Sequence, residues 1–102
     1  MSKQPNILFV MADQVNSAFL PAYGHPVVKM PHLDKIAAEG VVFDTAYCAY
    51  PICGPSRFSM LTGRLASEVG VFDHGCEMRA STPTVMHYLR QRGYHTALSG
   101  KM

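Results

Sequence analysis

The sequence of 102 residues lacks the features that mark nucleic-acid-binding proteins, zinc sites and disulfide-rich domains. Its nine lysines and arginines are scattered, and the net charge of +2 is too small to favour a nucleic-acid partner. Its three cysteines, Cys48, Cys53 and Cys76, include no C-x-x-C pair, which argues against a tetrahedral zinc site and a disulfide framework. Charged residues make up 16% and apolar residues 48%, a balance typical of a globular chain.

Long apolar runs are also missing. The run from Ile7 to Ala12 is shorter than the hydrophobic part of a signal peptide and far shorter than the roughly 20 residues that span a membrane. We therefore expect a cytoplasmic protein without membrane association. The same run follows Pro5 and is apolar at every position, which predicts a β-strand buried on both faces, as in a parallel sheet.

Prolines and glycines divide the rest of the chain into further elements. Pro31 can open a helix that Gly40 ends, and Pro55 fits the first turn of a second helix that Gly63 ends. A third helix is predicted to follow an N-cap signal at residues 81–83 and to end at residue 93.

Two more strands are predicted at residues 41–47 and 96–99, and residues 16–30 have the composition of a loop. The resulting order of strand, helix, strand, helix, helix and strand predicts an α/β fold with a mostly parallel sheet. Asp13 and Gln14 directly follow the first predicted strand, where α/β folds usually place their sites.

Cys53 is the residue around which chemistry is most strongly indicated. It precedes the start of the second predicted helix, and Arg57 follows it by four residues. A helix N-terminus attracts anions, and a guanidinium offers a planar set of donors for sulfate or phosphate oxygens. These residues alone indicate either an activated cysteine or an anion pocket. For any single cysteine, the ordinary alternative is a small buried hydrophobic residue.

Four segments together resemble the motifs of the type I, formylglycine-dependent sulfatases. Residues 51–63, PICGPSRFSMLTG, are similar to the C-x-P-S-R signature that is followed by an apolar pair and T-G. Residues 93–102, GYHTALSGKM, resemble G-Y-x-T-x-x-x-G-K, and residues 5–14, PNILFVMADQ, resemble the opening strand with its metal-binding acid. Residues 30–43, MPHLDKIAAEGVVF, are similar to P-N-L-D-x-L-A-x-E-G-x-x-F.

This resemblance implies that residues 1–102 form the N-terminal portion of a catalytic domain of the alkaline-phosphatase type, with a mostly parallel sheet flanked by helices. It also implies that a maturation enzyme oxidises Cys53 to formylglycine. One hydroxyl of the hydrated aldehyde then attacks the sulfur of a small organic sulfate ester and expels the alcohol. The second hydroxyl loses its proton, so that the aldehyde re-forms and sulfate leaves.

The resemblance further implies roles for individual residues. Cys53 is the precursor of the nucleophile and a metal ligand, Arg57 holds the hydrated aldehyde, and Lys101 bridges it to the sulfate. Asp13 and Gln14 bind one divalent ion that polarises the sulfate oxygens. Oxygen ligands favour Ca²⁺, Mn²⁺ or Mg²⁺ over zinc.

Two positions depart from the common family pattern. Many sulfatases have two adjacent acids after the first strand, whereas the Asp13–Gln14 pair resembles choline sulfatases and the related phosphonate monoester and phosphodiester hydrolases. His74 stands where those relatives tend to place an asparagine near the sulfate, which speaks against choline itself. Its imidazole can donate a proton to the leaving oxygen or contact an oxyanion.

Three functional hypotheses follow from these observations. The first is a sulfuric ester hydrolase, the second a phosphonate monoester or phosphodiester hydrolase, and the third an inactive chain, because further metal ligands of the family lie outside these 102 residues. A homo-oligomer of the full-length protein is compatible with each. The ordinary alternatives for single residues are a turn aspartate at Asp13, a helix-surface arginine at Arg57, a solvated lysine at Lys101 and a loop histidine at His74.

Overall fold

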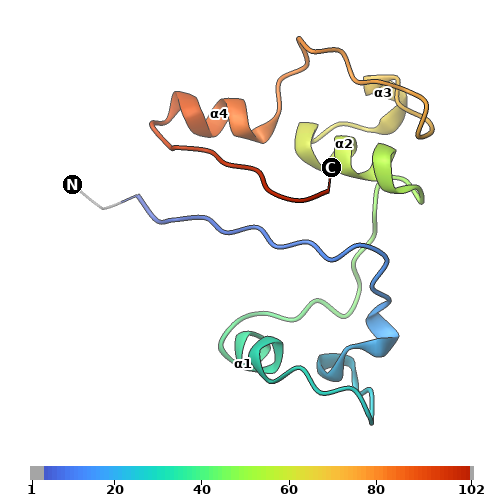
Figure 1. Cartoon of the computed structure of the whole chain (residues 1–102), viewed down its shortest axis with the longest axis vertical. Helices are drawn as coiled ribbons and strands as arrows, with labels where there is room; N and C mark the ends of the chain where they lie inside the picture. Colours follow the sequence, from blue (N-terminus) through green and yellow to red (C-terminus); the bar gives the residue numbers. More distant parts are fainter. Residues whose placement is uncertain (1–3, 102) are drawn as a thin grey trace. The chain divides into compact units, whose positions relative to one another are not determined.

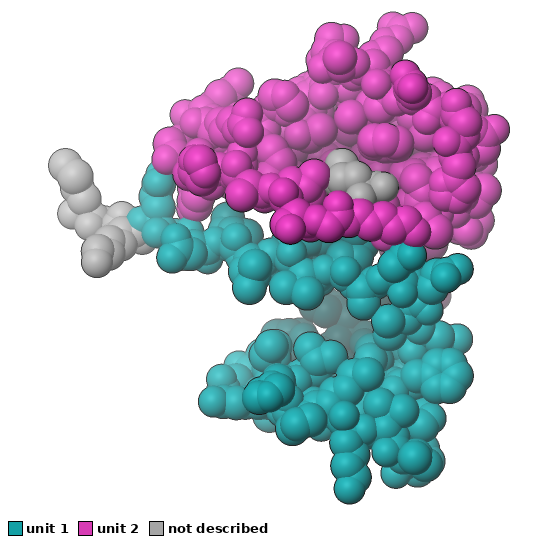
Figure 2. Space-filling view, in the orientation of Figure 1, with its two compact units in different colours: residues 1–46 teal, residues 47–102 magenta. Residues whose placement is uncertain are grey.

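The computed structural model describes residues 4–101 and forms two compact units, Met1–Ala46 and Tyr47–Met102, coloured separately in Figure 2. The described elements are η1 (Ser17–Phe19), η2 (Pro21–Tyr23), α1 (Pro31–Glu39), α2 (Cys53–Thr62), α3 (Ala66–Val69) and α4 (Val85–Gln91), of which Figure 1 labels the α-helices. Within the described part of the chain, no helix is both long and apolar enough to cross a membrane.

In the first unit, α1 begins at Pro31 as predicted, because proline loses nothing by lacking an N–H group in the first turn. The helix ends at Glu39, and Gly40 is its C-cap with φ −120° and ψ −146°. Gly40 does not adopt the left-handed conformation expected of a helix-ending glycine. Glycine is required there for space, because a Cβ atom would lie 2.9 Å from the carbonyl oxygen of Ile36.

The loop predicted at residues 16–30 contains the two short 3₁₀ helices η1 and η2. Side chains hold this segment locally: Nδ1 of His25 accepts the N–H of Val28 at 3.0 Å, and the rings of Phe19 and His25 lie 5.6 Å apart. The hydroxyl of Tyr23 donates to the carbonyl of Phe43 at 2.7 Å, which ties η2 to the segment after α1. Every described residue of this unit is half-buried or exposed.

In the second unit, α2 packs against α3 and α4. Its end at Gly63 confirms the prediction, since Gly63 is left-handed (φ 66°) and its N–H donates to the carbonyl of Ser59 at 2.8 Å. The small core of this unit consists of Pro55, Ala66 and Val71, of which Pro55 and Val71 are fully buried.

The start of α4 differs from the prediction of an N-cap at residues 81–83. The helix begins at Val85, and Thr84 is the N-cap. The N–H of Thr84 donates to Nδ1 of His87 at 3.0 Å, while the N–H of His87 donates to the carbonyl of Thr84 at 2.9 Å. A histidine three residues into the helix thus takes the part that Glu or Gln plays in the usual capping box, so the capping pattern is not the usual one of Ser or Thr with Glu or Gln.

The three predicted strands are not formed among residues 4–101, where all regular structure is helical. Residues 7–12, 41–47 and 96–99 have no strand pairing, and their apolar side chains are exposed, to 88% at Leu8 and 77% at Val41. A strand needs the N–H and C=O groups of a neighbour, so an apolar, β-branched segment does not become a strand by its own sequence.

The left-handed conformation at the end of α2 yields a stability prediction. We expect Gly63→Ala to lower the free energy of unfolding by about 1 kcal/mol, because a Cβ atom is strained at positive φ. Gly63→Asn is the matched control and loses less, since asparagine tolerates this conformation. Urea unfolding followed by circular dichroism measures both. Equal losses in the two variants would contradict the role assigned to backbone conformation.

Candidate functional site

Cys53 is the first residue of α2, and its side chain is half-buried. The N-cap residue is Ile52, so no side chain caps this end of the helix. Pro55 sits in the first turn, where it is fully buried and where its missing N–H group is tolerated. The sequence therefore places the Cys53 side chain at an uncapped, positively polarised helix start, which suits an anion.

Arg57 lies one helical turn after Cys53, on the same side of α2. It is only 8% exposed, and its Nη1 donates to the main-chain carbonyl of Lys101 at 2.6 Å. The segment after α4 runs back to α2 in Figure 1, which is how residues 44 positions apart come together. The structure thus brings Arg57 and Lys101 to one place, with the Lys101 residue exposed.

His74 lies in the turn that follows α3, and its ring rests against the first turn of α2. A Cβ atom built on Gly54 would lie 3.2 Å from Nδ1 and 3.8 Å from Cε1 of His74. The imidazole can approach this closely because Gly54 has no side chain. The His74 ring is therefore next to Gly54, the residue that follows Cys53.

Asp73, which sequence reasoning did not select, organises the turn that carries His74. Its Oδ1 accepts the N–H of Gly75 at 2.7 Å. Hydrogen bonds from the Cys76 side chain and from the Gly75 N–H lower the pKa of Asp73, with a smaller contribution from His74. Because the pKa is lowered, the carboxylate supports the turn at neutral pH, and this support is lost only as the pH falls through the lowered value. The sequence does carry a signal for this turn, because an aspartate two residues before a glycine is typical of an Asx-turn.

Asp13 and Gln14 belong to the first unit and form a turn directly after residues 7–12. Gln14 has φ 55°, and it is the one non-glycine residue in the described chain with positive φ. Such a conformation costs an L-residue about 1–2 kcal/mol and is concentrated at functional positions. The structure places these two residues next to one another, in a different unit from Cys53, Arg57, His74 and Lys101.

The two oxygen donors of Asp13 and Gln14 fit a hard divalent cation in their chemistry. Residues 4–101 contain no group of three or more His, Cys, Asp or Glu side chains placed to hold a metal ion. Among the described residues, Asp13 and Gln14 thus offer two oxygen donors but no complete metal site.

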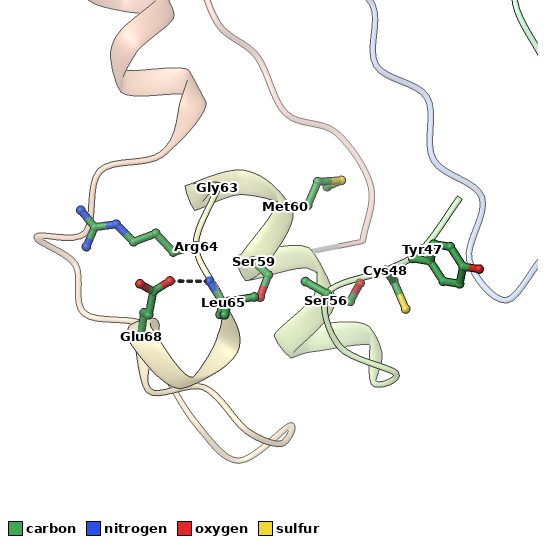
Figure 3. Close-up of a pocket in the computed structure, with 10 residues that line it drawn as sticks. Tyr47, Cys48, Ser56, Ser59, Met60, Gly63, Arg64, Leu65 and Glu68 are labelled. Atoms are coloured by element: carbon green, nitrogen blue, oxygen red, sulfur yellow. Dashed lines mark hydrogen bonds between the residues drawn. The ribbon is translucent and has the colours of Figure 1, made fainter. Parts of the chain in front are cut away.

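A cavity of the second unit lies beside α2 and α3 (Figure 3) and has a volume of about 450 Å³. Residues 47–49 and 63–65 border it, together with Ser56, Ser59 and Met60 of α2 and Glu68 of α3. At the edge of the cavity, the carboxylate of Glu68 accepts a hydrogen bond from the N–H of Leu65 at 2.8 Å, drawn as a dashed line in Figure 3. The hydroxyl of Ser59 is buried without a hydrogen-bond partner among the described residues. None of the predicted site residues lines this cavity.

Comparison with known proteins places the chain among the sulfatases. The sulfatase family profile matches residues 5–102. The chain is 40% identical over 99 residues to a choline-sulfatase of Rhizobium meliloti, with 97% of this chain and 19% of that protein covered. It is 37% identical over 100 residues to an N-acetylglucosamine-6-O-sulfatase of Bacteroides thetaiotaomicron (98% and 18% covered), and 36% identical over 107 residues to human arylsulfatase A (99% and 21% covered).

The chain therefore spans about a fifth of the length of the curated relatives that it matches. No solved structure matches it.

The buried Arg57 contact predicts a difference between two arginine-to-lysine changes. We expect Arg57→Lys to lower the free energy of unfolding by about 2 kcal/mol, because a charged hydrogen bond is lost and a buried ammonium has fewer well-placed donors. Arg64→Lys, at an exposed arginine just after the same helix, is expected to change it by less than about 0.5 kcal/mol. Chemical denaturation measures both, and equal effects would show that the Lys101 contact contributes nothing.

Proposed function

The chain belongs to the sulfatase family, and on that premise we propose that it supplies the nucleophile of a sulfuric ester hydrolase that acts on a small organic sulfate. In this proposal Cys53 is the precursor of formylglycine, and a divalent metal assists the reaction. The observation that carries the proposal is the position of Cys53 at an uncapped helix start, one turn before a buried arginine.

The side chains around Cys53 suit a sulfate group. The helix start and the Arg57 guanidinium both favour negative charge, and burial strengthens the interaction of Arg57 with its partners. The carbonyl of Lys101 orients the Arg57 guanidinium, and the same hydrogen bond holds the main chain of Lys101 beside α2. In the proposal, Arg57 holds residue 53 and the ammonium of Lys101 binds the sulfate oxygens as a point charge.

Formylglycine, once formed from Cys53, would add water to its aldehyde and so present two hydroxyls: one would attack sulfur and expel the alcohol, and deprotonation of the other would re-form the aldehyde and release sulfate. Its formation converts CH₂–SH and water to CHO and hydrogen sulfide with loss of two electrons and two protons, which an external oxidant used by the maturation enzyme takes up. His74 is proposed to donate a proton to the leaving alcohol oxygen, because its ring lies against Gly54 next to Cys53.

Asp13 and Gln14 are proposed to supply some of the ligands of a divalent metal ion, which would be Ca²⁺, Mn²⁺ or Mg²⁺. Both residues offer oxygen atoms, and the positive φ of Gln14 is the kind of local strain that functional sites retain. When bound, such an ion would polarise the sulfate oxygens. The residue formed from Cys53 would be a further ligand.

The finer fold is also a proposal. We infer that residues 7–12, 41–47 and 96–99 are strands of an alkaline-phosphatase-like α/β sheet in the complete domain. Their exposed apolar side chains and lack of pairing in the described structure support this, since such segments gain stability when neighbouring strands and helices cover them.

Conversion of Cys53 is the decisive test. The protein is co-expressed with a formylglycine-generating enzyme, and the peptide that spans Cys53 is examined by mass spectrometry. We expect the aldehyde at position 53 together with hydrolysis of an aryl sulfate, and at least about a thousandfold loss of activity in Cys53→Ala. Cys48→Ser, a change at an exposed cysteine, is the matched control and retains activity. A peptide that always keeps the thiol mass, with no hydrolysis, would overturn the proposal.

A second candidate function is favoured by the neutral amide of Gln14 beside Asp13. Sulfate monoesters, phosphodiesters and phosphonate monoesters all carry a single negative charge and react through similar geometry, so one site can serve all three. We expect a higher kcat/KM for an aryl sulfate than for the matched aryl phosphodiester and aryl phosphonate. A preference for either phosphorus ester, measured on the same preparation, would transfer the proposal to the hydrolases of those esters.

A further inference from the structure

The turn at residues 73–76, which we call the Asp73 turn, is fixed more firmly than its exposure suggests. Asp73 accepts the N–H of Gly75 at 2.7 Å, and interactions with the side chain and the N–H of Cys76 contribute to the lowered pKa of Asp73. The Asp73 carboxylate thus binds the main chain at Gly75, the residue that follows His74. His74 therefore lies in the sequence between the carboxylate of Asp73 and the N–H of Gly75 that this carboxylate binds.

The chain that enters the turn is anchored as well. Gly70 is left-handed (φ 73°), and its N–H donates to the carbonyl of Ala66 at 2.9 Å. The N–H of Val71 donates to the same carbonyl at 3.2 Å, and the Val71 side chain is fully buried. Only Phe72 separates this anchor from Asp73, so the start of the turn is set by the core of the unit.

His74 itself has no comparable anchor in its side chain. It is exposed, and its approach to α2 is defined by the 3.2 Å between Nδ1 and the position of a Cβ atom on Gly54. An exposed histidine on a loose loop would sample several positions, because each side chain retains its rotamer freedom unless it is packed. A fixed turn would confine His74 to the neighbourhood of the first turn of α2.

We propose that Asp73 is a positioning residue, which holds the turn that keeps the His74 imidazole beside residue 53. The inference rests on the proposed function, because it assigns His74 the proton that the leaving oxygen takes as the S–O bond breaks. The imidazole then regains a proton from water. Asp73 touches neither substrate nor nucleophile and acts through His74.

The first test compares Asp73→Ala, Asp73→Asn and His74→Ala in the full-length protein with converted Cys53. Asparagine can still accept the N–H of Gly75, whereas alanine cannot. We expect Asp73→Ala to lower kcat for an alkyl sulfate by at least about tenfold, with Asp73→Asn within about threefold of wild type and KM little changed. Glu77→Ala, at an exposed acid of the same loop, is the control and is expected to leave kcat unchanged.

A loss of general acid has a signature that simple destabilisation lacks. Nitrophenyl sulfate, whose phenolate leaves without a proton, should be hydrolysed nearly normally by Asp73→Ala and His74→Ala, while alkyl sulfate is not. The double variant Asp73→Ala/His74→Ala should be no slower than His74→Ala alone, because both changes remove the same group. Equal losses on both esters, or additive losses in the double variant, would overturn the proposal.

A spectroscopic arm separates this inference from the proposed function. The carbon-13-labelled imidazole signals of His74 should move in Asp73→Ala and return toward wild type in Asp73→Asn, while those of His95 stay in place. If the wild-type protein hydrolyses neither ester, the proposed function fails and these signals alone decide the positioning role. Unchanged His74 signals in Asp73→Ala would sink it in either case.

Discussion

The hydrogen bond from the Arg57 guanidinium to the main-chain carbonyl of Lys101 is the contact on which the second unit depends. It spans 2.6 Å in space and 44 positions in the sequence, and Arg57 is only 8% exposed. A buried guanidinium is tolerated only when its donors are satisfied, so α2 and the segment that contains Lys101 must be placed together. Because Cys53 is the first residue of α2, the same contact relates the proposed nucleophile to the proposed sulfate-binding lysine.

Each position of the C-x-P-S-R motif has a separate physical function in this arrangement. Cys53 occupies the uncapped helix start, and Gly54 leaves the space that the His74 ring uses. Pro55 is fully buried in the first turn, Ser56 borders the cavity, and Arg57 reaches the C-terminal segment. The motif is therefore the element that joins the loop after α3 to the segment after α4, in addition to carrying the reactive residue.

Sequence reasoning succeeded where structure is set by neighbouring residues. The start of α1 at Pro31 and the end of α2 at Gly63 were predicted, because they depend on the φ preference and missing N–H of proline and on the freedom of glycine at positive φ. The predicted start of α4 was less accurate, because its N-cap is Thr84, whose N–H donates to the His87 side chain instead of to a Glu or Gln. The predicted strands failed among the described residues, because pairing partners and not β-propensity decide whether an apolar segment becomes a strand.

The sequence by itself determined the membership in the sulfatase family and the separation of Cys53 and Arg57 by one helical turn, since both follow from residue order and helix geometry. The sequence also determined that Gln14 directly follows Asp13, whereas the positive φ of Gln14 was seen only in the structure. Only the tertiary structure brought Lys101 and His74 to α2. These two contacts join segments far apart in the chain, and the second also needs the missing side chain at Gly54, so local sequence rules describe neither.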